Sequence, residues 1–269
     1  MIAEPLDQRL LMRGGDPDLV GRELLHYIAA GIEHAPRSQQ VLIGPSEIGN
    51  PCRRRIAYKL LDTPGVRVLA PNWKATVGTG AHLWLADTFG VIEADVGVER
   101  FYVETELVIA ELGGELIKGT CDLYDRMTAT VVDWKTTSAP KLLDYKRHGP
   151  GAQYRAQAHL YGLGWRRLGL PVDQVMIVFL PRNGELCDTY VWYERFDVEL
   201  ARAALDRLAG IKQLVDTFGT SSLAMLPTTE AYCLHCPFLI FDSPDLVKGC
   251  PGDPAMLQPT RAAAIEMEK

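Results

Sequence analysis

The stretch that decides the fold is GTCDLYD at residues 119–125, followed by VVDWKTTS at residues 131–138. These letters belong to two predicted strands, 115–125 and 128–134, which are rich in β-forming residues. Asp133 and Lys135 are two apart on the second strand, so both side chains leave the same face. A hairpin would bring Asp122 beside Asp133. The sequence therefore predicts two carboxylates and one ammonium group together at the end of an apolar strand.

This combination of groups suits metal-assisted hydrolysis. The carboxylates can hold a hard divalent cation through oxygen. Lys135 can position or help deprotonate an attacking water, or stabilise an anionic transition state. A D-x-K pair on a surface strand is usually a solvated salt pair, so the pair alone does not decide between the two interpretations.

The remaining elements predict a layered domain around these strands. Helical periodicity and capping residues indicate helices at 17–35, 46–61, 73–89, 151–168 and 197–217. Alternation, apolar runs and turn signals indicate further strands at 101–110, 174–181 and 187–196. This order predicts an α/β (α+β) fold with one central mixed sheet flanked by helices.

Three side chains on predicted helices can complete the site. His82 shares a stripe with apolar residues and is expected to face the interior, where a lone histidine is more often a core residue than a ligand. Gln157 and Tyr161 are four residues apart and share a helix face. They are either core residues with satisfied hydrogen bonds or groups that contact a substrate or a metal-bound water.

Taken together, four motifs give a specific resemblance. In chain order they are G-x-x-x-H (Gly78 to His82), G-x-x-D (Gly119 to Asp122), D-x-K (Asp133 to Lys135) and Q-x-x-x-Y (Gln157 to Tyr161). This series resembles the RecB-like branch of the PD-(D/E)xK nuclease superfamily, although Cys121 stands where many members have proline. The resemblance implies a restriction-endonuclease-like core in which Mg²⁺ or Mn²⁺ is held by His82, Asp122, Asp133 and the carbonyl of Trp134. It also implies that Lys135 is catalytic and that Gln157 and Tyr161 support the site and the DNA backbone.

Six cysteines form a second pattern: Cys52, Cys121, Cys187, Cys233, Cys236 and Cys250. Cys233 and Cys236 are spaced C-x₂-C, and thirteen residues separate Cys236 from Cys250. Thiolates at such spacing can bind zinc or a [4Fe–4S] cluster, or they can be unlinked buried thiols. Cys121 and Cys187 lie on predicted strands and are expected to be buried apolar thiols.

One cysteine before the core and three after it resemble the iron–sulfur RecB-like nucleases. That group includes AddB-type subunits, CRISPR-associated RecB-like exonucleases and phage relatives. The resemblance implies a [4Fe–4S] cluster, with zinc as the alternative, bound by Cys52, Cys233, Cys236 and Cys250. Such a cluster would join a Cys-rich tail (219–269) to an N-terminal helical region (1–72) on either side of a nuclease core (73–218).

The charge of the chain limits how it could bind DNA. The 269 residues carry a net charge of −6, which excludes a protein that coats nucleic acid by bulk positive charge. A local groove remains possible, and Arg53, Arg54, Lys146 and Arg147 are its candidate DNA contacts. No base-reading motif is evident. The N-terminus does not resemble a signal peptide and no apolar run is long enough for a membrane span, so a cytoplasmic protein is expected.

The sequence therefore predicts a metal-dependent DNA exonuclease that acts on single-stranded DNA or DNA ends. One alternative is a catalytically idle iron–sulfur module that binds DNA or acts as a scaffold in a recombination or CRISPR-adaptation complex. Another is a zinc-stapled endonuclease. A homo-oligomer or a recombination or replication partner is also possible.

Overall fold

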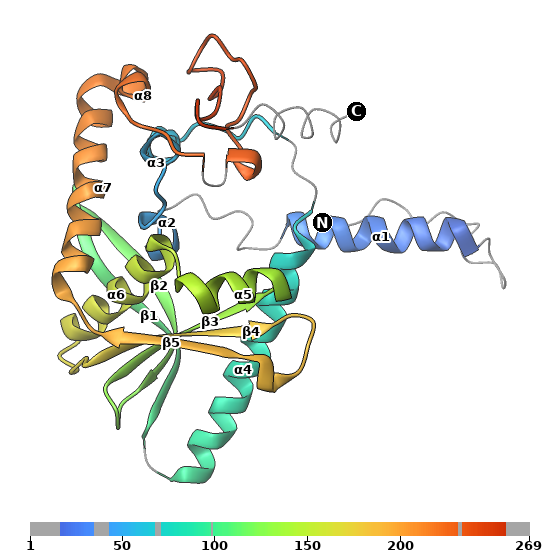
Figure 1. The fold of residues 1–269 in the computed structure, drawn as a ribbon, viewed down its shortest axis with the longest axis vertical. Coiled ribbons are helices and arrows are strands. Elements are labelled where there is room, and N and C mark those ends of the chain that lie inside the picture. The colour runs from blue at the N-terminus through green and yellow to red at the C-terminus, as the bar shows by residue number, and fades with distance from the viewer. Residues whose placement is uncertain (1–16, 35–42, 68–70, 98, 231–232, 257–269) are drawn as a thin grey trace.

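The core of the protein is a five-stranded mixed sheet (Figure 1). The computed structural model describes residues 17–34, 43–67, 71–97, 99–230 and 233–256. The strands are β1 (Phe101–Leu112), β2 (Glu115–Asp125), β3 (Thr130–Thr137), β4 (Gln174–Pro181) and β5 (Tyr190–Arg195), and they lie in this order across the sheet. β3 and β4 are parallel and the other neighbours are antiparallel. The predicted α+β fold with a central mixed sheet is confirmed.

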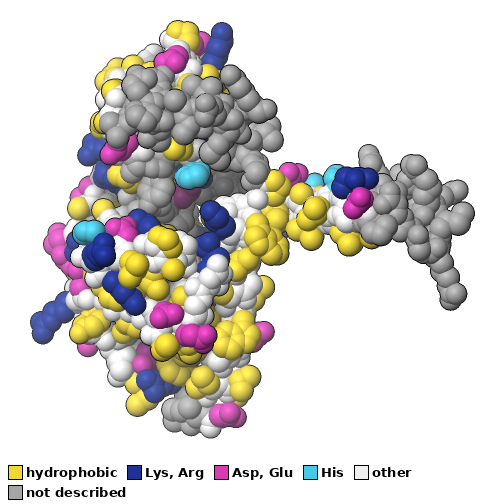
Figure 2. Space-filling view, turned by 45° about the vertical axis from the view of Figure 1, so that its right-hand side comes forward, with side chains coloured by type: hydrophobic (Ala, Val, Ile, Leu, Met, Phe, Trp, Pro, Cys, Tyr) yellow, Lys and Arg dark blue, Asp and Glu magenta, His cyan; other side chains and the backbone are white. Residues whose placement is uncertain are grey.

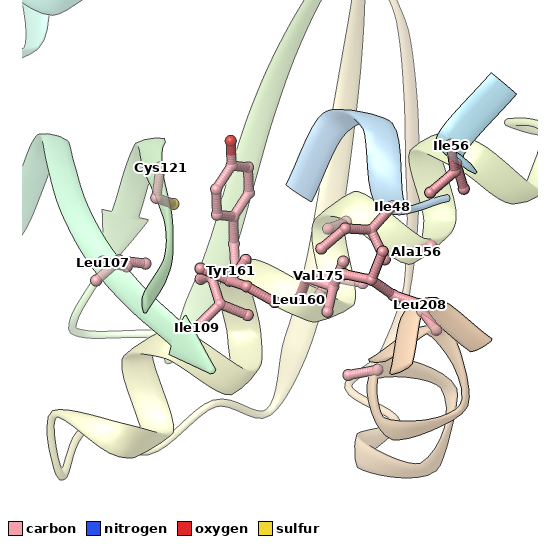
Figure 3. Close-up of a cluster of buried hydrophobic side chains, with 14 of the residues drawn as sticks. Ile48, Ile56, Leu107, Ile109, Cys121, Ala156, Leu160, Tyr161, Val175 and Leu208 are labelled. Carbon is pink, nitrogen blue, oxygen red and sulfur yellow. The ribbon is translucent and has the colours of Figure 1, made fainter. Parts of the chain in front are cut away.

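Helices cover both faces of this sheet. α4 (Trp73–Val96) packs on one face and α6 (Ala152–Arg167) on the other. The other helices of the described residues are α1 (Pro17–Glu33), α2 (Pro45–Ile48), α3 (Arg53–Leu60), α5 (Ala139–His148), α7 (Val198–Phe218) and α8 (Ser222–Met225). The main core lies between the sheet and α6, where Leu160 and Tyr161 meet Leu107 and Ile109 of β1 (Figure 3). A smaller apolar cluster lies on the opposite face, where Phe89 of α4 stacks on Trp134 of β3. Because side chains alternate along a strand, β3 contributes to both layers.

The helix predicted at 46–61 is interrupted. Residues 49–52 separate α2 from α3, and Ser46 lies inside α2 instead of capping a helix. Pro51 disfavours helical geometry at the residue before it, and the Asn50 side chain accepts a hydrogen bond from the Cys52 N–H at 3.0 Å. Gly49 passes so close to α6 that a Cβ there would lie 2.6 Å from the Gln153 carbonyl oxygen. The break therefore lets the chain turn sharply against α6.

Helix α4 begins where predicted but differs in length and exposure. Asn72 caps it by accepting a hydrogen bond from the Ala75 N–H at 3.2 Å, and the helix continues to Val96, seven residues beyond the predicted end at Phe89. Leu85 packs inward from this helix, whereas the neighbouring Trp84 side chain is 66% exposed.

Two further expectations fail near the sheet. The sequence did not predict α5, whose first turn contains Pro140 and follows directly after β3. Cys187 is exposed and lies on a short 3₁₀ turn at 186–188, because β5 begins only at Tyr190. It is therefore not a buried strand residue.

The segment 233–256 packs against α3, far away in sequence. The Tyr58 ring stacks on Phe238 with centroids 4.7 Å apart, and its hydroxyl donates to the Leu246 carbonyl at 2.6 Å. Helix α1 projects to one side (Figure 1) and exposes Leu24, Leu25 and Ile28. None of the helices in the described ranges combines the length and the apolarity that a membrane span requires.

Candidate active site

The site forms where β2 and β3 separate. Their antiparallel pairing ends at Leu123 opposite Val132, although β3 continues beside β4 as far as Thr137. Beyond that pair, Asp122 Oδ2 accepts a hydrogen bond from the Trp134 N–H at 2.7 Å. A side-chain carboxylate thus takes the place of a strand carbonyl, and it lies fixed and buried in the opening between the two strands.

His82 reaches this opening from α4. Its Nδ1 lies 3.2 Å from Asp122 Oδ1. Burial lowers the pKa of His82, but the hydrogen bond and charge of Asp122 outweigh it and raise the pKa above the ordinary value. The imidazole is therefore held close to an anion and gains a proton readily when no metal is bound.

Asp133 and Lys135 supply the opposite side of the opening. Lys135 Nζ lies 2.5 Å from Asp133 Oδ2, an ion-pair distance without hydrogen-bond geometry, and Asp133 Oδ1 has no hydrogen-bond partner among the described residues. The pKa of Asp133 is raised to about 6, chiefly by burial; the charge of Lys135 opposes this rise and the charge of Asp122 adds to it. Burial lowers the pKa of Lys135, yet the charges of Asp133 and Asp122 raise it overall. Lys135 therefore remains an ammonium ion.

Gln157 and Tyr161 are both buried on α6. Gln157 Nε2 donates to the Tyr161 hydroxyl at 3.4 Å, while Gln157 Oε1 has no partner among the described residues. Burial raises the pKa of Tyr161 strongly, and the charges of Asp133 and Asp122 raise it further. Tyr161 is thus a neutral hydroxyl within the field of both carboxylates.

These residues fit a hard divalent cation. Buried acceptors without partners cost free energy, and Asp133 Oδ1 and Gln157 Oε1 are two such atoms. Carboxylate oxygens and water are the ligands that Mg²⁺ and Mn²⁺ prefer. The N–H of Trp134 is fixed by Asp122, whereas its carbonyl as a ligand stays a prediction.

The sequence did not single out Glu104 of β1. His82, Glu104 and Asp122 each offer a donor atom, and these three atoms lie within 4.8 Å of one another. The pairs Val103–Leu123 and Thr105–Cys121 on either side place Glu104 across from Asp122. The alternation in FYVETELVIA indicates a strand, but it does not reveal which glutamate faces the site.

We expect the affinity for Mn²⁺ to fall as the pH is lowered through about 6. Metal binding needs Asp133 ionised and His82 neutral. Asp133 protonates near 6 and the pKa of His82 is raised, so lower pH adds a proton to each and both changes oppose binding. Isothermal titration across this pH range checks the slope, which approaches about tenfold per pH unit for each proton released.

The control for this titration is His148→Gln. His148 is exposed on α5 and pairs with Asp144 at 2.9 Å, so it is a histidine outside the proposed ligand set. The variant should keep the wild-type pH dependence. An affinity for Mn²⁺ that does not change between acid and neutral pH would contradict the assignment of Asp133 and His82 as ligands.

The second candidate site is a small cavity that Cys52, Cys233, Cys236 and Cys250 line together. Burial raises the pKa of Cys233 to about 11 and also raises that of Cys236, and the neighbouring thiols add to both shifts. All four are free thiols. Thiols that are buried and close together become thiolates when a metal supplies the positive charge, so the donor set fits zinc or an iron–sulfur cluster.

The predicted DNA contacts differ in their surroundings. Arg54 is partly buried, and it donates to the Leu223 carbonyl at 2.8 Å and to Cys250 Sγ at 3.8 Å. These contacts explain Arg54 as a link between α3 and the tail. Arg53, Lys146 and Arg147 are exposed, the last two at the end of α5. On the face that Figure 2 shows, Lys and Arg side chains are scattered among acidic ones, so DNA contact by these residues stays a prediction.

Comparison with known proteins finds distant structural similarity only. No protein-family model matches the chain, and no curated protein matches it. A protein described as SSO0001 shares 19% identity over 82% of this chain and 92% of its own, with a TM-score of 0.46. A phage-related exonuclease from Haemophilus somnus 129PT shares 17% sequence identity over 62% of this chain and 82% of its own, with a TM-score of 0.41. The alkaline exonuclease LHK-Exo from Laribacter hongkongensis shares 10% sequence identity over 70% of this chain and 97% of its own, with a TM-score of 0.45.

Proposed function

We propose that the chain is a metal-dependent DNA exonuclease that hydrolyses phosphodiester bonds in single-stranded DNA or at DNA ends. One observation carries the proposal: His82, Asp122, Asp133 and Lys135 come together where β2 and β3 separate. A carboxylate pair, an imidazole and a buried ammonium in one opening can hold a cation and stabilise a phosphoryl transition state.

Each residue has a distinct role in this proposal. His82, Asp122 and Asp133 would hold Mg²⁺ or Mn²⁺, which would polarise the scissile phosphate and lower the pKa of an attacking water. Lys135, held beside Asp133 and 5.1 Å from the centroid of the Tyr154 ring, offers its ammonium to the attacking water or to the charge that develops on phosphate oxygens. Gln157 and Tyr161 would orient a water or a phosphate oxygen.

A cavity beside this site supports a path for DNA. It has a volume of about 180 Å³ and lies where α5 meets the start of α6. Its lining includes Lys141 and His148, which both pair with Asp144, together with Tyr154, whose ring is close to Lys135. Basic and aromatic side chains of this kind suit the backbone and unpaired bases of a single strand.

The test is hydrolysis of end-labelled linear single-stranded, linear double-stranded and closed circular DNA. We expect Mg²⁺ or Mn²⁺ to support loss of the linear substrates, because ends or single strands are the proposed targets, while closed circles persist. Chelation of the metal should stop the reaction. Cleavage of circles would indicate an endonuclease instead. Binding of DNA without hydrolysis of any substrate would indicate the idle scaffold module.

We further propose that the four clustered cysteines hold a [4Fe–4S] cluster, with zinc as the alternative. Cys52 precedes α3, and the other three ligands lie in the segment that packs on α3. A metal centre there would link the segments that precede and follow the nuclease core in the sequence. It would stabilise the fold, because the free energy of metal binding adds to the free energy of folding.

A further inference from the structure

We propose that Glu104 is a further ligand of the divalent cation and holds it together with His82 and Asp122. This inference deepens the proposed function, because it concerns the same metal site. None of the four motifs contains Glu104, and the fold brings it there from the edge strand β1.

Distances place Glu104 within a ligand set. Its Oε1 lies 3.9 Å from His82 Nδ1, which in turn lies 3.2 Å from Asp122 Oδ1. One donor atom from each of the three lies within 4.8 Å of the others. An imidazole nitrogen and two carboxylate oxygens at such separations can converge on one ion.

The backbone of β1 is specially shaped at this position. Glu104 has φ of +43°, a left-handed conformation that a residue with a side chain rarely adopts in a strand. Strained residues of this kind persist where the surroundings hold them, and they are frequent at functional sites. Here the unusual conformation accompanies a side chain that faces Asp122 and His82.

Asp133 is an independent indication of a ligand at the same place. Only 2% of its side chain is exposed, and its Oδ1 has no hydrogen-bond partner among the described residues. Asp133 directly precedes Trp134, whose N–H donates to Asp122 Oδ2 at 2.7 Å, so Asp133 borders the same opening. Lys135 pairs with Oδ2 of this carboxylate, and the other buried oxygen, Oδ1, is left for a second cation or a water.

The exposure of the carboxylates gives Glu104 a particular position in the set. The exposed fraction of the side chain is 39% for Glu104, 10% for Asp122 and 2% for Asp133. Solvent exposure therefore increases from Asp133 through Asp122 to Glu104. Because Mg²⁺ and Mn²⁺ keep several waters, Glu104 would hold the hydrated, solvent-facing side of the ion.

The experiment is Mn²⁺ binding to the full chain, measured by electron paramagnetic resonance of free Mn²⁺, for wild type, Glu104→Gln and Glu104→Asp. We expect Glu104→Gln to weaken Mn²⁺ binding by about tenfold or more. Glu104→Asp keeps the charge and should weaken it less. The matched control is Glu106→Gln on the same strand, where Glu106 is exposed and pairs with Lys118 at 3.0 Å; its affinity should equal that of wild type.

Wild-type affinity in Glu104→Gln would overturn the ligand assignment. If Glu104→Gln fails to fold, Glu104→Asp decides: reduced affinity supports the assignment and unchanged affinity overturns it. DNA hydrolysis by wild type is scored separately. If Glu104→Gln binds Mn²⁺ more weakly but wild type does not cleave DNA, Glu104 is a metal ligand and the proposed nuclease function is wrong. If wild type cleaves DNA but Glu104→Gln binds Mn²⁺ as tightly as wild type, the nuclease function stands and Glu104 is not a ligand.

Discussion

Lys135→Met is expected to lower the single-turnover rate of DNA hydrolysis by about 100- to 10,000-fold. The ammonium lies 2.5 Å from Asp133 Oδ2 and is the positive side chain proposed to act on the water or the phosphate. Mn²⁺ binding should be as tight as in wild type or tighter, because the substitution removes a positive charge beside the cation. Loss of rate without loss of metal would therefore identify Lys135 as a catalytic group.

The control for Lys135 is Lys118→Met. Lys118 lies on β2, is exposed and pairs with Glu106, so it shares the residue type but not the site. Its variant should hydrolyse DNA at the wild-type rate. A Lys135→Met protein as active as this control would show that the D-x-K pair is only an ion pair.

Cys236→Ser is expected to remove the bound metal and to destabilise the protein. Cys236 lines the same cavity as Cys52, although 183 residues lie between the two cysteines in the sequence. A link across so long a loop stabilises chiefly by restricting the unfolded chain, by about 3–5 kcal/mol in the loop-entropy model. Thermal unfolding and elemental analysis check the two effects, and wild type should contain iron and absorb near ~400 nm.

The matched substitution is Cys187→Ser, at the exposed cysteine of the 3₁₀ turn. It should leave both metal content and melting temperature unchanged. Colourless wild-type protein with one zinc ion would refute the iron–sulfur assignment, but a metal link between Cys52 and the other three cysteines would stand. Metal-free wild type that melts at the same temperature as Cys236→Ser would refute the link itself.

The sequence predicts the sheet well because its signals are local. The strands 115–125 and 174–181 agree with the structure at both ends, since alternation, apolar runs and flanking turns define them. Pro51 is a local signal against the continuous helix predicted at 46–61. The close approach of Gly49 to α6 was not predictable in the same way. It depends on contact with α6 about a hundred residues later in the chain, and sequence periodicity contains no such contact.

The site illustrates the same limit. A simple hairpin between β2 and β3 was the basis for placing Asp122 near Asp133, yet the strands separate there and Asp122 replaces a strand partner. Glu104 escaped notice because its position depends on the β1–β2 register and on an unusual backbone angle. The positive run at Arg53–Arg55 gave no sign in the sequence that Arg54 would contact Leu223 and Cys250.

The most direct test of the central claim compares wild type with Asp133→Asn on labelled linear single-stranded DNA in Mn²⁺. Asp133 is the most buried carboxylate of the site, and it is one of the residues proposed to hold the cation. The account predicts hydrolysis by wild type and a rate at least about 100-fold lower in the variant. Equal rates in the two proteins would contradict it.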